Sequence, residues 1–201
     1  MNRTPLRASR LVAAVVGMML TLPTISRAQT WVGELLGSSE VPPNASSATG
    51  FMTVSLSGNF LSVVMNWNGL TVAPSAAHIH CCTSAPATNV GVAIGLPGLP
   101  AATSGTYNNL FDLTLASTYS AGFVTNFGGG TASGAQVALI NGLNSRNAYG
   151  NIHNSVFPGG EIRSNLVVTP EPSSVVLLAL GMVGVGAVAM RRRRVAKLKG
   201  R

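Results

Sequence analysis

The stretch FMTVSLSGNFLSVVMNW, residues 51–67, decides the fold class because its apolar side chains alternate with polar ones. In its first half every second residue is apolar: Met52, Val54 and Leu56. In its second half the same alternation gives Leu61, Val63, Met65 and Trp67. The Gly58-Asn59 pair between the halves is typical of a two-residue hairpin turn. The stretch therefore predicts two antiparallel strands, each with one face toward a core.

Further period-two runs lie on both sides of this hairpin: Trp31–Leu36, Ala77–His80, Val90–Leu96, Leu110–Leu115, Ala148–His153 and Glu161–Val168. Together they predict an all-β fold, an antiparallel, Greek-key-like sandwich or barrel of about eight strands. One short helix is expected over Ser133–Leu143, where Val137, Ile140 and Leu143 have helical spacing. Ser133 and Gln136 form a capping-box pattern at its start.

The charge of the chain is confined to its two ends. The 201 residues carry a formal charge of +8, yet 11 of the 13 basic residues precede residue 29 or follow residue 190. Between Gln29 and Thr169 there are two arginines and four acidic residues, so the net formal charge of this segment is 2 − 4 = −2. The basic composition therefore does not indicate nucleic-acid binding, and no nucleic-acid partner is expected.

The N-terminal 28 residues have the composition of a secretory signal peptide. Three arginines precede residue 11, and the apolar run Leu11–Leu22 follows. Ser26-Arg27-Ala28 then supplies small residues at the −3 and −1 positions of a cleavage site. We expect export across the cytoplasmic membrane and cleavage by signal peptidase after Ala28. A membrane anchor is the alternative, but the run is short for a membrane span and ends at Pro23.

The C-terminal segment, residues 170–201, has three parts in order. Pro170-Glu171-Pro172 precedes an apolar stretch over residues 173–190, and a basic tail, residues 191–201, begins with Arg191, Arg192, Arg193 and Arg194. Eighteen helical residues would span about 27 Å, close to the thickness of a hydrocarbon core. The arginines would hold that end in the cytoplasm. The stretch therefore predicts a transmembrane helix, which would leave residues 29–169 outside.

This arrangement resembles the PEP-CTERM sorting signal of exopolysaccharide-producing bacteria, which an exosortase recognises. The resemblance implies transient anchoring in the membrane, cleavage near Pro170-Glu171-Pro172, and release or transfer to the cell surface or extracellular matrix. A plain single-pass tail anchor is the alternative.

The intervening domain, residues 29–169, resembles the CHRD family, which was named from chordin. Four segments carry the resemblance, in the family's order: Glu40-Val41-Pro42-Pro43 followed by Gly50, then Ala77-His78-Ile79-His80, then Tyr149-Gly150-Asn151-Ile152-His153, and finally Pro158-Gly159-Gly160-Glu161-Ile162-Arg163. The family implies an all-β fold but little biochemistry. This chain departs from the pattern at Cys81-Cys82 and at Ser164, where glycines are more usual.

His78, His80 and His153 are the only histidines of the chain, and all three lie in the exported domain. Residues i and i+2 of a strand point to one face about 6.7 Å apart, so His78 and His80 can converge on one ion. His153, on another strand, is the candidate third ligand of a copper or zinc site. A weak likeness to the His-x-His pattern of copper/zinc superoxide dismutases agrees with this. The alternative is structural: partly buried histidines that hydrogen-bond strands to loops.

Cys81 and Cys82 are adjacent in an exported chain, where oxidation is expected. Their Cα atoms would lie about 3.8 Å apart, below the usual range for a disulfide. A bridge between these neighbours is one prediction. Free thiols, soft-metal ligands beside His80 and bridges to a partner chain are the alternatives.

Motifs of enzymes are scarce in this sequence. There is no Gly-x-Ser-x-Gly elbow, and Gly128-Gly129-Gly130 is not followed by a phosphate-binding pattern. Glu161 and Arg163, at i and i+2, are expected to form a local ion pair. We therefore expect a non-enzymatic structural or adhesive component of an extracellular polymer matrix, with exopolysaccharide or a surface protein as partner. The competing hypothesis is a metal-binding protein or small oxidoreductase that uses the three histidines.

Overall fold

The computed structural model describes residues 29–82, 88–169, 180–186 and 188. The strands are β1 (Gln29–Leu36), β2 (Thr49–Ser57), β3 (Phe60–Asn68), β4 (Ala76–Cys81), β5 (Val92–Gly95), β6 (Gly105–Asp112), β7 (Ala148–His153), β8 (Ile162–Asn165) and β9 (Val167–Val168). The helices of the domain are α2 (Ala121–Asn126), α3 (Ala132–Asn144) and the short 3-10 turns η1 (Gly37–Ser39) and η2 (Ala116–Thr118). The fold is therefore mostly β.

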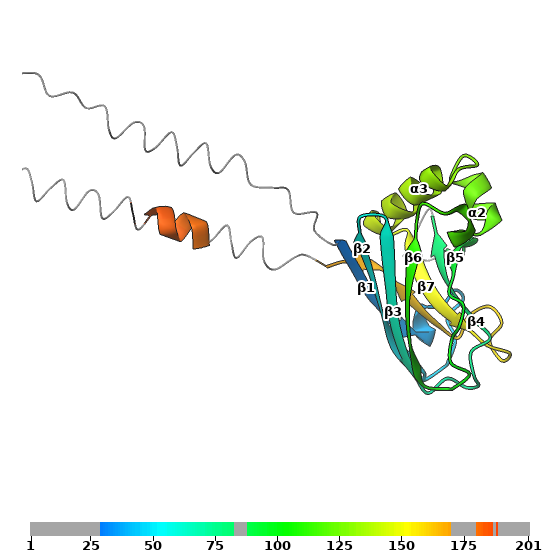
Figure 1. Ribbon diagram of the computed structural model, residues 1–201. Helices are drawn as coiled ribbons and strands as arrows, with labels where there is room; N and C mark the ends of the chain where they lie inside the picture. Colours follow the sequence, from blue (N-terminus) through cyan, green and yellow to red (C-terminus); the bar gives the residue numbers. More distant parts are fainter. Residues whose placement is uncertain (1–28, 83–87, 170–179, 187, 189–201) are drawn as a thin grey trace, which may run out of the picture.

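One antiparallel sheet contains all of these strands, in the order β5-β4-β7-β8-β1-β2-β3-β6, with β9 paired to β1. The sheet curls so that β7 faces β2, and the two strands approach so closely that a methyl group at Gly150 would overlap the Met52 sulfur. Its concave face encloses the apolar core, which includes Trp31, Met65 and Ile79. Figure 1 shows α2 and α3 together at one end of the curled sheet.

The hairpin expected from residues 51–67 is confirmed in its turn and its faces. Ser57 pairs with Phe60 across Gly58-Asn59, and Gly58 adopts a positive φ of 58°. The alternate apolar residues of β3 are buried: Leu61, Val63, Met65 and Trp67. The alternation of apolar and polar residues therefore correctly predicted both the two strands and the face that each of them buries.

Other boundaries differ from the expectation. The strand predicted over Leu110–Leu115 is β6, which starts at Gly105 and ends at Asp112. The run over Glu161–Val168 divides into β8 and β9. In addition, α2 was not expected. Ser120 caps it by accepting a hydrogen bond from the Phe123 backbone N–H.

The predicted helix is present as α3, but its capping residue is different. Thr131, not Ser133, accepts the hydrogen bond from the Gly134 backbone N–H, at 3.1 Å. Gln136 does not reach back to the helix start, because its side chain donates to Asn59. The helix is therefore capped by Thr131 alone and not by the expected capping box of Ser133 and Gln136.

The segments predicted as signal peptide, residues 1–28, and as Pro170-Glu171-Pro172 lie outside the described residues. Of the apolar stretch 173–190, residues 180–186 and 188 are described, and they are helical. No helix among the described residues is both long and apolar enough to cross a membrane. The basic tail also lies outside the described residues.

Candidate metal centre

The outer face of β4, β7 and β8 is polar, although most of it is covered. The core face of these strands carries Ala77, Ile79, Ile152 and Ile162. His78, His80 and His153 therefore project from the opposite face. The antiparallel register places His78 beside Asn151, His80 beside Tyr149, and His153 beside Ala76. Because β4 pairs directly with β7, His153 lies close enough to the two histidines of β4 for the three to share a site.

The three histidines form a cluster. One ring nitrogen of each lies within 4.8 Å of the others. The ring centroids are 4.9 Å apart for His78 and His153, 5.5 Å for His78 and His80, and 6.2 Å for His80 and His153. The predicted convergence is confirmed, whereas ion binding stays a prediction.

Backbone carbonyls orient two of the rings. Nδ1 of His80 lies 2.7 Å from the Val90 carbonyl oxygen, and Nδ1 of His153 lies 3.0 Å from that of Pro158. Because a carbonyl only accepts, each Nδ1 must carry the proton, and each Nε2 keeps its lone pair. Metal-binding histidines are commonly oriented by such second hydrogen bonds.

Two ring nitrogens in this cluster have no hydrogen-bond partner among the described residues. They are Nδ1 of His78 and Nε2 of His153, and both are buried. A buried polar atom without a partner is uncommon in folded proteins and calls for an explanation, such as a ligand or an ion. The structural alternative accounts for the hydrogen bonds of His80 and His153 to loop carbonyls, but it supplies no partner for these two nitrogens.

The electrostatics of the cluster favour neutral imidazoles. Burial lowers the pKa of His78 to about 4, with further lowering by His153 and His80. Burial also lowers the pKa of His80 and of His153, although hydrogen bonds to the Val90 and Pro158 carbonyls oppose that shift. Neutral imidazole is the form that binds transition metals.

Stacked side chains hold His80 in place. Its ring stacks on that of Tyr149 with centroids 4.6 Å apart, and the Arg163 guanidinium lies 3.3 Å from the Tyr149 centroid. Arg163 in turn donates to Thr88 and Asn89 in the loop that leads to Val90. Arg163 and Tyr149 thereby position the carbonyl that orients His80.

Two buried carboxylates lie in the same polar layer. Glu161 accepts hydrogen bonds from Ser46, Thr71 and Asn154, three residues in separate loops. The expected partnership between Glu161 and Arg163 is therefore replaced: the carboxylate whose charge acts on the Arg163 pKa is Glu40. Burial raises the pKa of Glu40 to about 7, while Arg163 and a hydrogen bond from Asn151 lower it.

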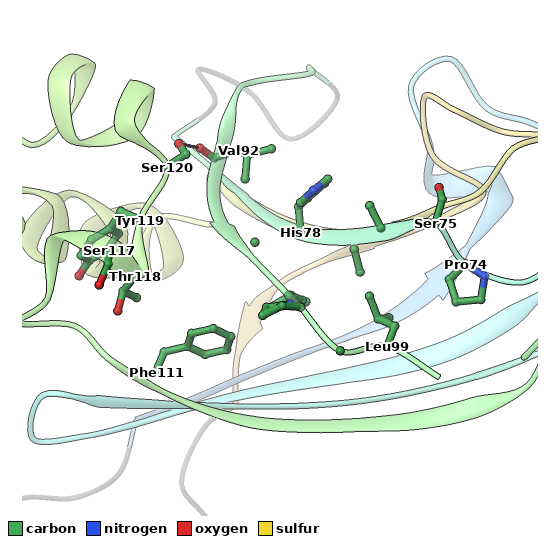
Figure 2. Close-up of a pocket in the computed structure, with 16 residues that line it drawn as sticks. Pro74, Ser75, His78, Val92, Leu99, Phe111, Ser117, Thr118, Tyr119 and Ser120 are labelled. Atoms are coloured by element: carbon green, nitrogen blue, oxygen red, sulfur yellow. Dashed lines mark hydrogen bonds between the residues drawn. The ribbon is translucent and has the colours of Figure 1, made fainter. Parts of the chain in front are cut away.

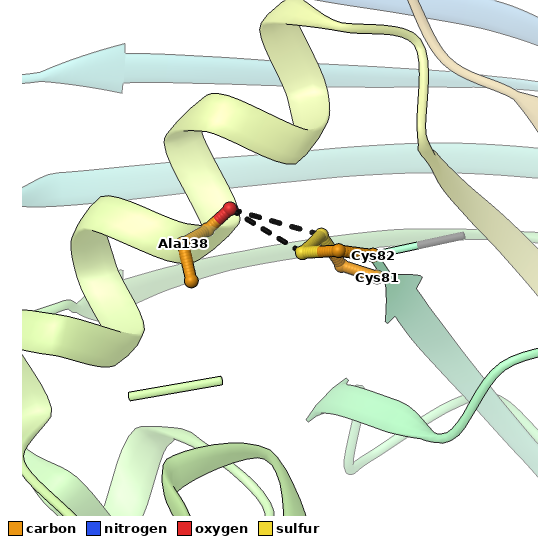
Figure 3. The surroundings of a disulfide bond; sticks show 3 residues. All are labelled: Cys81, Cys82 and Ala138. Carbon is orange, nitrogen blue, oxygen red and sulfur yellow. Dashed lines mark hydrogen bonds between the residues drawn. A yellow bond between two sulfur atoms is a disulfide. The ribbon is translucent and has the colours of Figure 1, made fainter. Parts of the chain in front are cut away.

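A disulfide joins Cys81 to Cys82 at the end of β4. Figure 3 shows both sulfur atoms directed toward α3, where they lie 3.9 Å and 3.4 Å from the Ala138 carbonyl oxygen. A methyl group at Gly142 of α3 would overlap the Cys81 sulfur. The buried Cys81 thus belongs to the core face of β4, opposite the histidines, and neither sulfur is free to act as the thiolate ligand considered above.

A groove lies beside the histidine cluster. It is an open groove of about 760 Å³ that extends from Pro74 along β4 and β5 to Phe111 and residues 117–120. Figure 2 shows His78 on one side of its strand and Leu99 and Phe111 on the other. Of the three histidines only His78 lines this groove, so the groove and the histidine cluster adjoin at that residue.

Two family models match the chain, one over the domain and one over the C-terminal segment. Residues 32–166 match the CHRD domain, and residues 168–194 match the PEP-CTERM protein-sorting motif. The chain therefore belongs to the CHRD domain family, and its C-terminus carries a sorting motif that an exosortase processes, which supports an extracellular protein. No curated protein and no solved structure matches the chain.

Histidine burial also predicts a pH dependence of stability. A histidine whose pKa is lowered in the folded state stabilises the fold above the unfolded value of about 6.5, and this stabilisation is lost as the pH falls toward the folded value. Glu40 has the opposite effect, because its raised pKa adds stability at low pH that is lost between about 4.5 and 7. Since three histidines oppose one carboxyl, we expect the free energy of unfolding of the metal-free protein to fall from pH 6.5 to 4.5.

Urea unfolding at closely spaced pH values measures this dependence. His78→Asn should flatten the decline, and Glu40→Gln should make it steeper. If stability rises on acidification in the unmodified protein, the histidines are not buried as neutral groups.

Proposed function

We propose that the mature chain is a non-enzymatic, metal-binding component of the extracellular polymer matrix. Its CHRD domain holds one transition-metal ion between His78, His80 and His153. The observation that carries the proposal is the buried lone pair of His153 Nε2, which lies beside two other neutral imidazoles and has no partner among the described residues.

The donor set defines the class of ion. Three imidazole nitrogens suit zinc and copper better than the hard cations calcium and magnesium. Ligand nitrogens around zinc lie about 2.0–2.1 Å from the ion, so pairs of them are about 3–3.5 Å apart. From a spread of at most 4.8 Å, modest rotation of the rings brings the nitrogens to that separation.

A structural role agrees with how the acidic residues are used. Glu161 serves as a hydrogen-bond acceptor for three loops, and Asp112 accepts from Thr114 at the end of β6. Glu34 is exposed on β1. A small oxidoreductase remains the second candidate, and copper-dependent turnover would favour it.

The outer face of the other half of the sheet supports contact with polysaccharide or a surface protein. There, β2, β3 and β6 present hydroxyl and amide side chains together with exposed aromatic and aliphatic ones: Thr53, Ser55, Ser62, Asn66, Asn108, Phe51, Phe60, Val64 and Leu110. Both rings are more than a third exposed, Phe51 at 39% and Phe60 at 49%. Such a surface favours hydrogen bonding and stacking over electrostatic capture.

Titration with zinc against a competing chromophoric chelator tests the metal site. We expect one ion to bind per mature chain, and each of His78→Asn, His80→Asn and His153→Asn to weaken binding by about 100-fold or more. Glu34→Gln, a change at an exposed acid of β1, three strands from β4 in the sheet, should bind as the unmodified protein does. Equal binding by the unmodified protein and the three histidine variants would overturn the proposal.

Processing gives a second, independent prediction. The mature protein should begin near Gln29 and end near Pro170-Glu171-Pro172, as intact-mass measurement of the purified surface form would show. Glu171→Ala should leave the C-terminal segment attached without changing the unfolding curve, because Glu171 lies beyond the last strand. An intact arginine tail on the whole mature population would instead indicate a permanent anchor.

A further inference from the structure

Asn151 lies at the histidine cluster and has an unusual partner. Its Oδ1 is 3.1 Å from Nε2 of His80, and its side chain is 2% exposed. Nδ1 of His80 already donates its proton to the Val90 carbonyl at 2.7 Å. In a neutral ring Nε2 is therefore an acceptor, and an amide oxygen is an acceptor as well. Two lone pairs thus face one another in a buried place.

The amide of Asn151 is not free to turn its nitrogen toward His80. Its side chain lowers the pKa of the neighbouring Glu40 carboxyl, which is the effect of an NH₂ group that faces the carboxylate. Nδ2 lies 2.9 Å from the position that a Cβ on Gly160 would occupy, and the Glu40 carboxylate adjoins the same position. Glu40 thus lies on the Nδ2 side of the amide, and Oδ1 faces His80.

Two acceptors that face each other repel unless a proton or a metal cation lies between them. A second proton would make His80 an imidazolium and would place a positive charge on a ring that is only 7% exposed, which is unfavourable. A cation needs no such protonation. The 3.1 Å separation of Nε2 and Oδ1 also falls within the roughly 3–3.5 Å expected between two ligands of one tetrahedral zinc ion.

We propose that Oδ1 of Asn151 is the fourth ligand of the ion held by His78, His80 and His153, and that Glu40 is the positioning residue that aims it. The resulting N₃O set selects Zn²⁺ or Cu²⁺ over Cu⁺, because Cu⁺ prefers soft sulfur ligands. This inference rests on the metal site proposed above and adds to it one ligand and the charge state of the ion.

Cobalt(II) replaces zinc in such sites and reports the ligand set through its visible absorption, so it is the probe for this test. We compare the mature protein with Asn151→Leu, Asn151→Asp, Glu40→Gln and the control Asn108→Leu, an exposed asparagine of β6. Asn151→Leu should shift the cobalt spectrum and weaken zinc binding at least tenfold. Asn151→Asp keeps the oxygen and adds a charge, so it should retain a four-coordinate spectrum and bind more tightly. Glu40→Gln should weaken binding less than Asn151→Leu.

Failure of this inference is distinguishable from failure of the metal site. If the unmodified protein binds no cobalt or zinc, both proposals fall. If it binds but Asn151→Leu gives the same spectrum and affinity, the site stands and the fourth ligand is not Asn151. Nitrogen chemical shifts of the histidine rings give a measurement that needs no variant. In the metal-free protein at pH 7.5 His80 should carry its proton on Nδ1, and a proton on Nε2 would overturn the inference.

Discussion

Glu161→Ala is expected to lower the free energy of unfolding by about 4 kcal/mol, because it removes a buried carboxylate that accepts four hydrogen bonds. The side chain is fully buried and accepts from the Ser46 hydroxyl, from both the backbone and the hydroxyl of Thr71, and from the Asn154 amide. These donors come from three different loops. Loss of the carboxylate therefore removes the acceptor that joins these three loops to the start of β8.

Chemical denaturation measures the loss, and two variants calibrate it. Glu34→Ala, at an exposed position of β1, should change stability by less than about 0.5 kcal/mol. Glu161→Gln should fall between the two, because one carboxylate oxygen is replaced by an NH₂ group that cannot accept. A cost below about 1 kcal/mol for Glu161→Ala would mean that the three loops do not depend on this acceptor.

Gly142→Ala is expected to cost about 3 kcal/mol, because the new methyl group would overlap the Cys81 sulfur and lie 3.0 Å from that of Cys82. Alanine otherwise favours a helix over glycine by about 0.5–1 kcal/mol, so the steric cost must exceed that gain. Gly122→Ala in α2 is the matched control, since nothing lies within 4 Å of its added methyl group. That control should be neutral or stabilising.

A double-mutant cycle isolates the contact with the disulfide. On a background with both Cys81 and Cys82 replaced by alanine, Gly142→Ala should lose most of its cost, because the overlapping sulfur atoms are gone. If Gly142→Ala lowers the free energy of unfolding equally on both backgrounds, contact with the sulfur atoms is not the reason that alanine is unfavourable at this position.

Much of the fold could be predicted because alternation in a half-buried strand reflects burial directly. It located β2, β3, β4 and β7, and it placed His78 and His80 on one face. It failed at β6, which lies at the edge of the sheet and carries Tyr107 and Asn109 on its core side. Those residues break the apolar pattern while Leu110, 60% exposed, faces outward.

The site could be predicted only in part, for a different reason. The pairing of β4 with β7, which brings His153 to the other two histidines, is a long-range contact with no local sequence signal. The groups that orient the rings are backbone carbonyls of Val90 and Pro158, and any residue type supplies a carbonyl. Asn151 stands in the family motif beside His153, but its role becomes visible only when its distance to His80 is known.

The most direct measurement is the metal content of the mature protein purified from cells without chelators, determined by elemental analysis against protein concentration. We expect close to one equivalent of zinc or copper per chain, and close to none in His153→Asn purified in the same way. An unmodified protein that carries no transition metal, and takes up none when zinc or copper is supplied, would contradict the metal centre.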